Sequence, residues 1–104
     1  MRVRAEIAYD GAPFHGFAVN RDVRTIAGDL EAVLSRVVGS EVVVTCAGRT
    51  DRGVHAAGQV LSFDVPDDVD LAKLRRSVNR LCAPSIVMST LESADDDFDA
   101  RFNA

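Results

Sequence analysis

The chain has little of several features that mark common protein classes. No apolar run in its 104 residues approaches the roughly 20 residues that a membrane-spanning helix requires. The N-terminal segment lacks the apolar core of a secretory signal peptide and is typical of the start of a strand. There are only two cysteines, Cys46 and Cys82, in different predicted elements and without metal-ligand spacing. We therefore expect a cytoplasmic protein with reduced core thiols and no membrane contact.

The chain also lacks the basic excess that is typical of nucleic-acid-binding proteins. Its formal net charge is −4, with 12 lysines and arginines against 16 acidic residues. The imbalance is uneven, because residues 1–56 hold seven arginines and seven acids, whereas residues 57–104 hold five basic and nine acidic side chains. A surface that faces a polyanion is therefore expected in the first part. The arginines concerned are Arg2, Arg4, Arg21, Arg24, Arg49 and Arg52.

The residues that are present suit one small globular domain. Hydrophobic residues make up 47% of the chain and charged residues 27%, interleaved rather than in blocks. A chain of this length can bury a core without disulfides. No repeat, low-complexity tract or domain boundary divides it, so residues 1–104 are predicted to form a single domain.

Two amphipathic helices are predicted from capping residues and apolar spacing. Thr25 can cap a helix that runs to about Val38, where Gly39 is placed to end it. Asp70 can cap a second helix that stops near Pro84. The residues expected on the apolar stripes are Ile26, Leu30, Val33, Leu34 and Val37 in the first helix and Leu71, Leu74, Val78 and Leu81 in the second.

Four strands are predicted around these helices. They are residues 2–9, the β-branched run 41–47, residues 59–65 and residues 86–91. The order β-α-β-β-α-β is that of an α+β, ferredoxin-like split β-α-β sandwich (βαββαβ), in which an antiparallel sheet carries two helices on one face. The other sheet face is the place to expect a partner.

A polar segment between two predicted strands carries the residues best suited to chemistry. It reads Ala47-Gly48-Arg49-Thr50-Asp51-Arg52-Gly53-Val54-His55-Ala56. Asp51 stands between Arg49 and Arg52, and nearby positive charge favours the ionised carboxylate that nucleophilic catalysis requires. The same cluster could instead be a set of salt bridges that only fixes the turn, since structural ion pairs are common.

This segment closely resembles the active-site signature of the TruA family of tRNA pseudouridine synthases. Further matches follow in the family's order: Tyr9-Asp10-Gly11 with Phe14-His15-Gly16-Phe17, Thr25 with Leu30-Glu31, Gln59-Val60 with Phe63, Asn79 with Leu81 and Pro84, and Phe98-Asp99-Ala100-Arg101-Phe102-Asn103-Ala104. The chain departs from the family at Phe17, often Trp there, at residues 18–20, where glutamines are usual, and at Asp99, commonly His. These departures concern substrate contacts more than chemistry.

The resemblance implies that residues 1–104 are the N-terminal catalytic domain of such an enzyme, with the second domain absent and the fragment alone inactive. Family members act as homodimers and isomerise uridine to pseudouridine in the tRNA anticodon stem-loop, with no cofactor and no metal. Asp51 would be the catalytic carboxylate, attacking either the ribose or the uracil ring or assisting glycal formation. Arg49 would fill the space left by the flipped nucleotide and pair with Asp51. Other substrate contacts would come from Thr50, Arg52, His55, Arg21 and Arg24.

Two other functions stay open at this point. The chain could be a non-catalytic RNA-binding module that uses the free sheet face, although its strands lack the paired exposed aromatics that stack bases. It could also be a small hydrolase whose loop grips phosphate, although the loop has no glycine-rich phosphate cradle.

Three smaller expectations concern the remaining polar and apolar residues. A metal site of His15, His55 and Asp51 has no support in their spacing. The run Asp95-Asp96-Asp97 is expected to be a solvated tail. The phenylalanines after it suggest a segment that packs against a missing domain, and self-association through the surface so exposed is a hypothesis.

Overall fold

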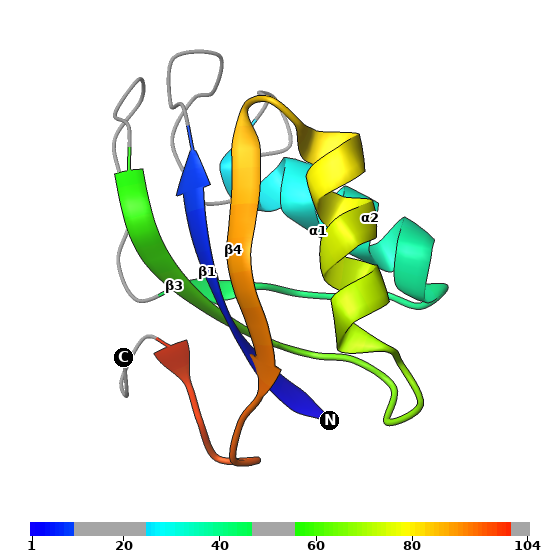
Figure 1. Cartoon of the computed structure of the whole chain (residues 1–104). Helices are drawn as coiled ribbons and strands as arrows, with labels where there is room; N and C mark the ends of the chain where they lie inside the picture. Colours follow the sequence, from blue (N-terminus) through cyan, green and yellow to red (C-terminus); the bar gives the residue numbers. More distant parts are fainter. Residues whose placement is uncertain (10–24, 47–55, 101–104) are drawn as a thin grey trace.

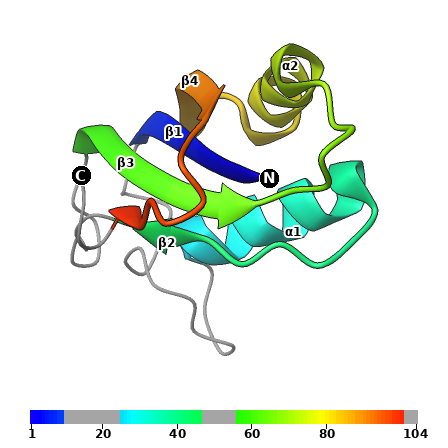
Figure 2. The ribbon, with the colours of Figure 1, turned by 90° about the horizontal axis from the view of Figure 1, so that it is seen from below.

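The computed structural model describes residues 1–9, 25–46 and 56–100, and these form a sheet with two helices on one face (Figures 1 and 2). The elements are β1 (Arg2–Tyr9), α1 (Ile26–Val38), β2 (Thr45–Cys46), β3 (Ala56–Asp64), α2 (Leu71–Cys82) and β4 (Ile86–Ser93). The strands pair antiparallel in the order β2-β3-β1-β4. The predicted α+β, ferredoxin-like arrangement is confirmed.

The core lies between the sheet and the helices. In β1 the side chains that face the helices are buried and those that face away are partly exposed, because successive residues of a strand point to opposite faces. The most completely buried large side chains of the core are Ile7, Ile26, Leu30, Leu34, Leu61, Ile86 and Met88. The alternation that predicted β1 in the sequence therefore reflects one covered and one open face.

Both helices begin where their capping residues predict. The Thr25 Oγ1 accepts a hydrogen bond from the Gly28 N–H (3.2 Å), and an Asp70 carboxylate oxygen accepts one from the Lys73 N–H (3.1 Å). At the end of α1, Gly39 has a φ of 87° and its N–H donates to the Ser35 carbonyl (2.9 Å). Only a residue without a Cβ adopts that conformation readily, so Gly39 ends the helix.

The predicted apolar stripes are wrong at the last turn of each helix. Val37 is 39% exposed and Leu81 is 44% exposed, although both were expected to face the core. In each case the next residue, Val38 or Cys82, packs partly buried against the core instead. Helical spacing predicts which side chains share a face of the helix. It does not predict how far along the helix the sheet and the other helix cover that face.

The largest correction concerns the predicted buried strand at residues 41–47. Of the described residues 41–46, only Thr45 and Cys46 pair with β3, and Val43 is 61% exposed. The N–H groups before them donate to side chains of α1: that of Val42 to the Ser35 Oγ and that of Val44 to a Glu31 carboxylate oxygen, each at 2.9 Å. A β-branched run predicts extended backbone, but the helix supplies these hydrogen bonds rather than a strand.

The other two strands differ from the prediction only at their ends. β3 spans Ala56–Asp64 rather than residues 59–65, and β4 runs two residues further than predicted, to Ser93. Cys46 and Cys82 are partly buried and form no disulfide, as expected. None of the helices in the described part of the chain is long and apolar enough to cross a membrane.

Candidate active site

All the residues predicted to carry chemistry lie outside the described residues. They are Asp51, Arg49, Thr50, Arg52 and His55 in residues 47–55, and Arg21 and Arg24 in residues 10–24. The described residues on either side of these segments nevertheless determine where each segment leaves and rejoins the fold.

The two segments meet the sheet at the same end. Tyr9, the last residue of β1, is paired with Ala56, the first residue of β3, and on its other side with Ile86, the first residue of β4. β2 runs antiparallel to β3 and therefore ends toward the beginning of β3. Residues 10–24 follow Tyr9 directly, and residues 47–55 join Cys46 to Ala56. The fold thus brings the end of β1, where the first segment begins, beside the start of β3, where the second segment ends (Figure 1). Cys46, where the second segment begins, lies opposite Leu61 further along β3.

The arginines on the open face of the sheet are paired with carboxylates. Arg2 donates to both carboxylate oxygens of Asp64 (2.7 and 3.3 Å), and Arg4 lies 3.1 Å from Glu6 and 3.6 Å from Glu92. The hydrogen bond to Asp64 and the charge of that carboxylate raise the pKa of Arg2, and the same contact with Arg2 lowers the pKa of Asp64. The expected polyanion surface is therefore revised: Arg2 and Arg4 already have anionic partners within the domain.

Residues 94–100, here called the C-terminal strap, dock on this open face. The Ala94 N–H donates to the Arg2 carbonyl (2.9 Å), the Arg2 guanidinium donates to the Phe98 carbonyl, and the Ala100 N–H donates to the Ser62 Oγ (3.0 Å). Ser62 and Ala100 are each 1% exposed. This domain itself therefore holds the described part of the segment, and packing against a missing domain stays a prediction. Asp95, Asp96 and Asp97 of the strap are exposed, as expected of a solvated run.

We expect Ser62→Ala to loosen the strap without unfolding the domain. The change leaves the buried Ala100 N–H without its acceptor, which costs about 1–3 kcal/mol in proteins. Hydrogen exchange of the Ala100 amide should accelerate at least about fivefold, since 1.4 kcal/mol is a factor of ten and about 1 kcal/mol a factor of five. Ser93→Ala, which alters an exposed serine at the end of β4, is the matched control. Unchanged protection of Ala100 in Ser62→Ala would show that this hydrogen bond does not hold the strap.

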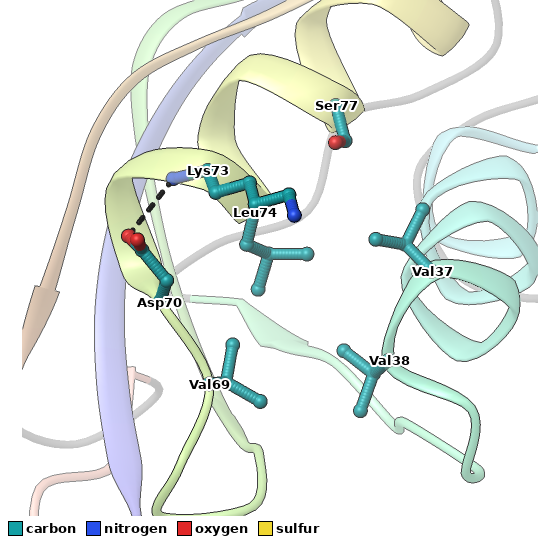
Figure 3. A pocket seen from close by; sticks show the side chains of 7 residues that line it. All are labelled: Val37, Val38, Val69, Asp70, Lys73, Leu74 and Ser77. Atoms are coloured by element: carbon teal, nitrogen blue, oxygen red, sulfur yellow. Dashed lines mark hydrogen bonds between the residues drawn. The ribbon is translucent and has the colours of Figure 1, made fainter.

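A hollow in the described surface lies between the two helices. It is an open groove of about 210 Å³ between the end of α1 and the start of α2 (Figure 3). Its lining is Val37, Val38, Val69, Asp70, Lys73, Leu74 and Ser77. Thr25, where the segment 10–24 joins α1, lies at the opposite end of this helix, roughly 18 Å away along its axis. The groove therefore lies far from Thr25, the point where residues 10–24 join α1, and no cluster of metal-ligating side chains occurs among the described residues.

The sequence does not indicate the roles of Ser62 and Glu31, whose side chains bond to distant parts of the chain. Ser62 reads as one polar position in an alternating strand, and its burial comes from the strap, 38 residues further along the chain. Glu31 was noted only as part of the Leu30-Glu31 match, and its contact with Val44 depends on the path of the chain after α1. The sequence itself carries no signal for either contact. The burial of Ser62 and the path of the chain beside Glu31 are known only from the fold.

The fold defines a ferredoxin-like α+β domain. Tyr9 and Ala56, to which residues 10–24 and 47–55 are attached, lie side by side at one end of its sheet. The chain belongs to the tRNA pseudouridine synthase family, since the sequence model of that family matches residues 5–103. The match includes both segments, 10–24 and 47–55, that carry the predicted site residues. The family resemblance inferred from the motifs is thereby confirmed.

Curated relatives agree with this assignment. The tRNA pseudouridine synthase A of Brevibacillus brevis is 45% identical over 102 residues, which cover 98% of this chain and 42% of that protein. Those of Cutibacterium acnes and Frankia casuarinae are 45% and 46% identical over 105 residues, covering 99% and 100% of this chain and 38% of each relative. The chain therefore spans about two fifths of the length of these relatives and corresponds to their N-terminal part.

Proposed function

We propose that this chain is the N-terminal catalytic part of an enzyme that isomerises uridine to pseudouridine in tRNA. The observation that carries the proposal is the family match over residues 5–103, which spans the whole Arg-Thr-Asp-Arg segment. The relatives named above bear the name of this activity. The described fold supports it by attaching that segment to two strands of a packed sheet, where a catalytic side chain can be held in a fixed geometry.

Asp51 is the proposed catalytic carboxylate. The reaction cuts the bond between the ribose carbon and the uracil nitrogen, turns the base within the site, and joins the same ribose carbon to a ring carbon. That ring carbon loses its proton and the freed nitrogen gains one, so the atoms balance. Asp51 either forms a covalent bond to the ribose or the uracil, or assists glycal formation. The isomerisation has no net oxidation or group transfer, so the proposal includes no cofactor.

Arginines outside the described residues are the proposed contacts to RNA. Arg49 is proposed to pair with Asp51, keep it ionised and fill the space of the flipped nucleotide. Arg52, Arg21 and Arg24 are proposed phosphate contacts, and Thr50 and His55 complete the substrate-binding set. Of the six arginines expected on a polyanion-facing surface, Arg2 and Arg4 are paired with carboxylates, which favours the four arginines of the candidate segments.

The anticodon stem-loop is the proposed substrate, and cytoplasm the proposed location. We further propose that the complete enzyme contains a second domain and acts as a homodimer, so that this part is inactive alone. The length of the relatives supports a second domain, because this chain covers only 38–42% of each of the three described above.

The non-catalytic RNA-binding module is the weaker alternative. On the open face β1 presents Arg2, Arg4, Glu6 and Ala8, while Tyr9 and Phe63 are buried in the core. The described part of the open face of β1 thus offers no aromatic side chain on which a base could stack.

The proposed function is tested by joining residues 1–104 to the C-terminal part of the Brevibacillus brevis relative. Pseudouridine formation on an anticodon stem-loop RNA is then measured for the chain alone and for the joined protein. We expect activity only in the joined protein. If the joined protein folds and binds the RNA but forms no pseudouridine, the enzyme proposal is wrong and the RNA-binding module is favoured.

A further inference from the structure

The connection from α1 to β2 is held by the helix rather than by the sheet. Figures 1 and 2 show it running back alongside α1 before it reaches β2. Its two hydrogen bonds join alternate residues of the connection to residues one turn apart in the helix. They run from the Val44 N–H to a Glu31 carboxylate oxygen and from the Val42 N–H to the Ser35 Oγ, each at 2.9 Å.

The spacing of the two pairs explains why a helix can serve this extended segment. Residues four apart in a helix are about 6 Å apart along its axis. Alternate residues of an extended chain are about 6.6 Å apart and present their N–H groups on the same side. Glu31 and Ser35 therefore match Val42 and Val44, and two side chains of α1 take the place of a partner strand.

The helix that makes these contacts is itself firmly held. Leu30 and Leu34, which directly precede Glu31 and Ser35, are completely buried between α1 and the sheet. The Val44 contact lies two residues before Cys46, after which the segment 47–55 begins. Glu31 thus connects the rigid core to the chain immediately before that segment.

We propose that Glu31 is a positioning residue for the segment that contains Asp51. Its carboxylate holds the Val44 N–H and so aligns Thr45 and Cys46 with β3 at the point where the segment departs. The catalytic part of this inference rests on the proposed function of Asp51, whereas its structural part does not. Misplacing a reacting group by about 1 Å can reduce turnover about a hundredfold, so a distant anchor of this kind can affect the rate.

The inference is tested with Glu31→Ala, which removes the acceptor, and Glu31→Gln, which retains an acceptor oxygen. In the chain alone, Glu31→Ala should accelerate exchange of the Val44 amide at least about tenfold while the β1 amides keep their protection. Glu31→Gln should restore most of the protection. Glu41→Ala, which alters an exposed glutamate in the same connection, is the control and should resemble the unmodified chain.

In the joined protein, Glu31→Ala should lower kcat about ten- to a hundredfold, and Glu31→Gln should recover most of it. The inference is wrong if Val44 exchange is unchanged, if kcat is retained, or if Glu31→Gln is as defective as Glu31→Ala. Should the unmodified joined protein be inactive, the proposed function fails. Val44 exchange in the chain alone then decides whether Glu31 holds this connection.

Discussion

Asp51→Asn in the joined protein is expected to reduce kcat for pseudouridine formation by at least about a thousandfold. The amide has nearly the shape of the carboxylate but lacks the charge that makes it a nucleophile, and loss of a nucleophile is among the largest effects of a single substitution. RNA binding should change little, because the proposed phosphate contacts come from arginines. Turnover and RNA affinity are measured separately on the same anticodon stem-loop.

The matched control is Asp95→Asn, which neutralises an exposed aspartate of the C-terminal strap. It should retain full turnover, which separates the loss of one particular carboxylate from a change in net charge. Amide exchange of β1 and β3 confirms that both variants are folded. If Asp51→Asn keeps more than about a tenth of the turnover, Asp51 is not the catalytic carboxylate.

Asn79→Ala is expected to cause the largest loss of stability among the surface-accessible changes considered. The Asn79 side chain accepts from the Met88 N–H (2.6 Å) and donates to the Met88 carbonyl (3.0 Å), and so links α2 to β4. Replacing Asn79 with alanine removes the side-chain hydrogen bonds to the N–H and the carbonyl of Met88 in β4. The expected cost is about 2–3 kcal/mol, or roughly 10 °C in Tm for a domain of this size.

The same substitution should promote association. β4 lies at the edge of the sheet, and exposed N–H and C=O groups on an edge strand pair readily with other chains. Urea unfolding monitored by circular dichroism gives the stability, and light scattering at several concentrations gives the association. Arg80→Ala changes the exposed neighbouring residue and should alter stability by less than about 0.5 kcal/mol. Equal stability of the two variants would show that the Asn79 bridge contributes little.

Local sequence was sufficient for the elements whose boundaries depend on their own residues. β1 begins and ends as its alternation predicts, and both helices begin at the predicted capping residues, Thr25 and Asp70. Gly39 ends α1 as its position indicates. These features are local because a cap or a turn satisfies backbone groups only a few residues away.

The predictions from the sequence were wrong or missing where a distant element of the fold decides the hydrogen bonding or the burial of a residue. Val43 belongs to a run with high strand propensity, yet α1 takes up the hydrogen bonds of its neighbours and Val43 faces solvent. Ser62 is buried because the C-terminal strap crosses it, and nothing near it in the sequence indicates this. Propensity describes what a segment can form, whereas packing decides which partner it receives.

The sequence by itself determined the family, the order of the elements and the identity of the candidate catalytic residue, because motif spacing and local periodicity are properties of the chain. Only the tertiary structure brought Tyr9 beside Ala56, and with them the attachment points of the two candidate segments. It alone showed that Arg2 and Arg4 are paired with carboxylates and that Glu31 holds Val44. The separation in sequence between the partners in these contacts ranges from 2 positions (Arg4 and Glu6) to 88 (Arg4 and Glu92). The longer-range contacts form only when the helices and strands pack around a common core.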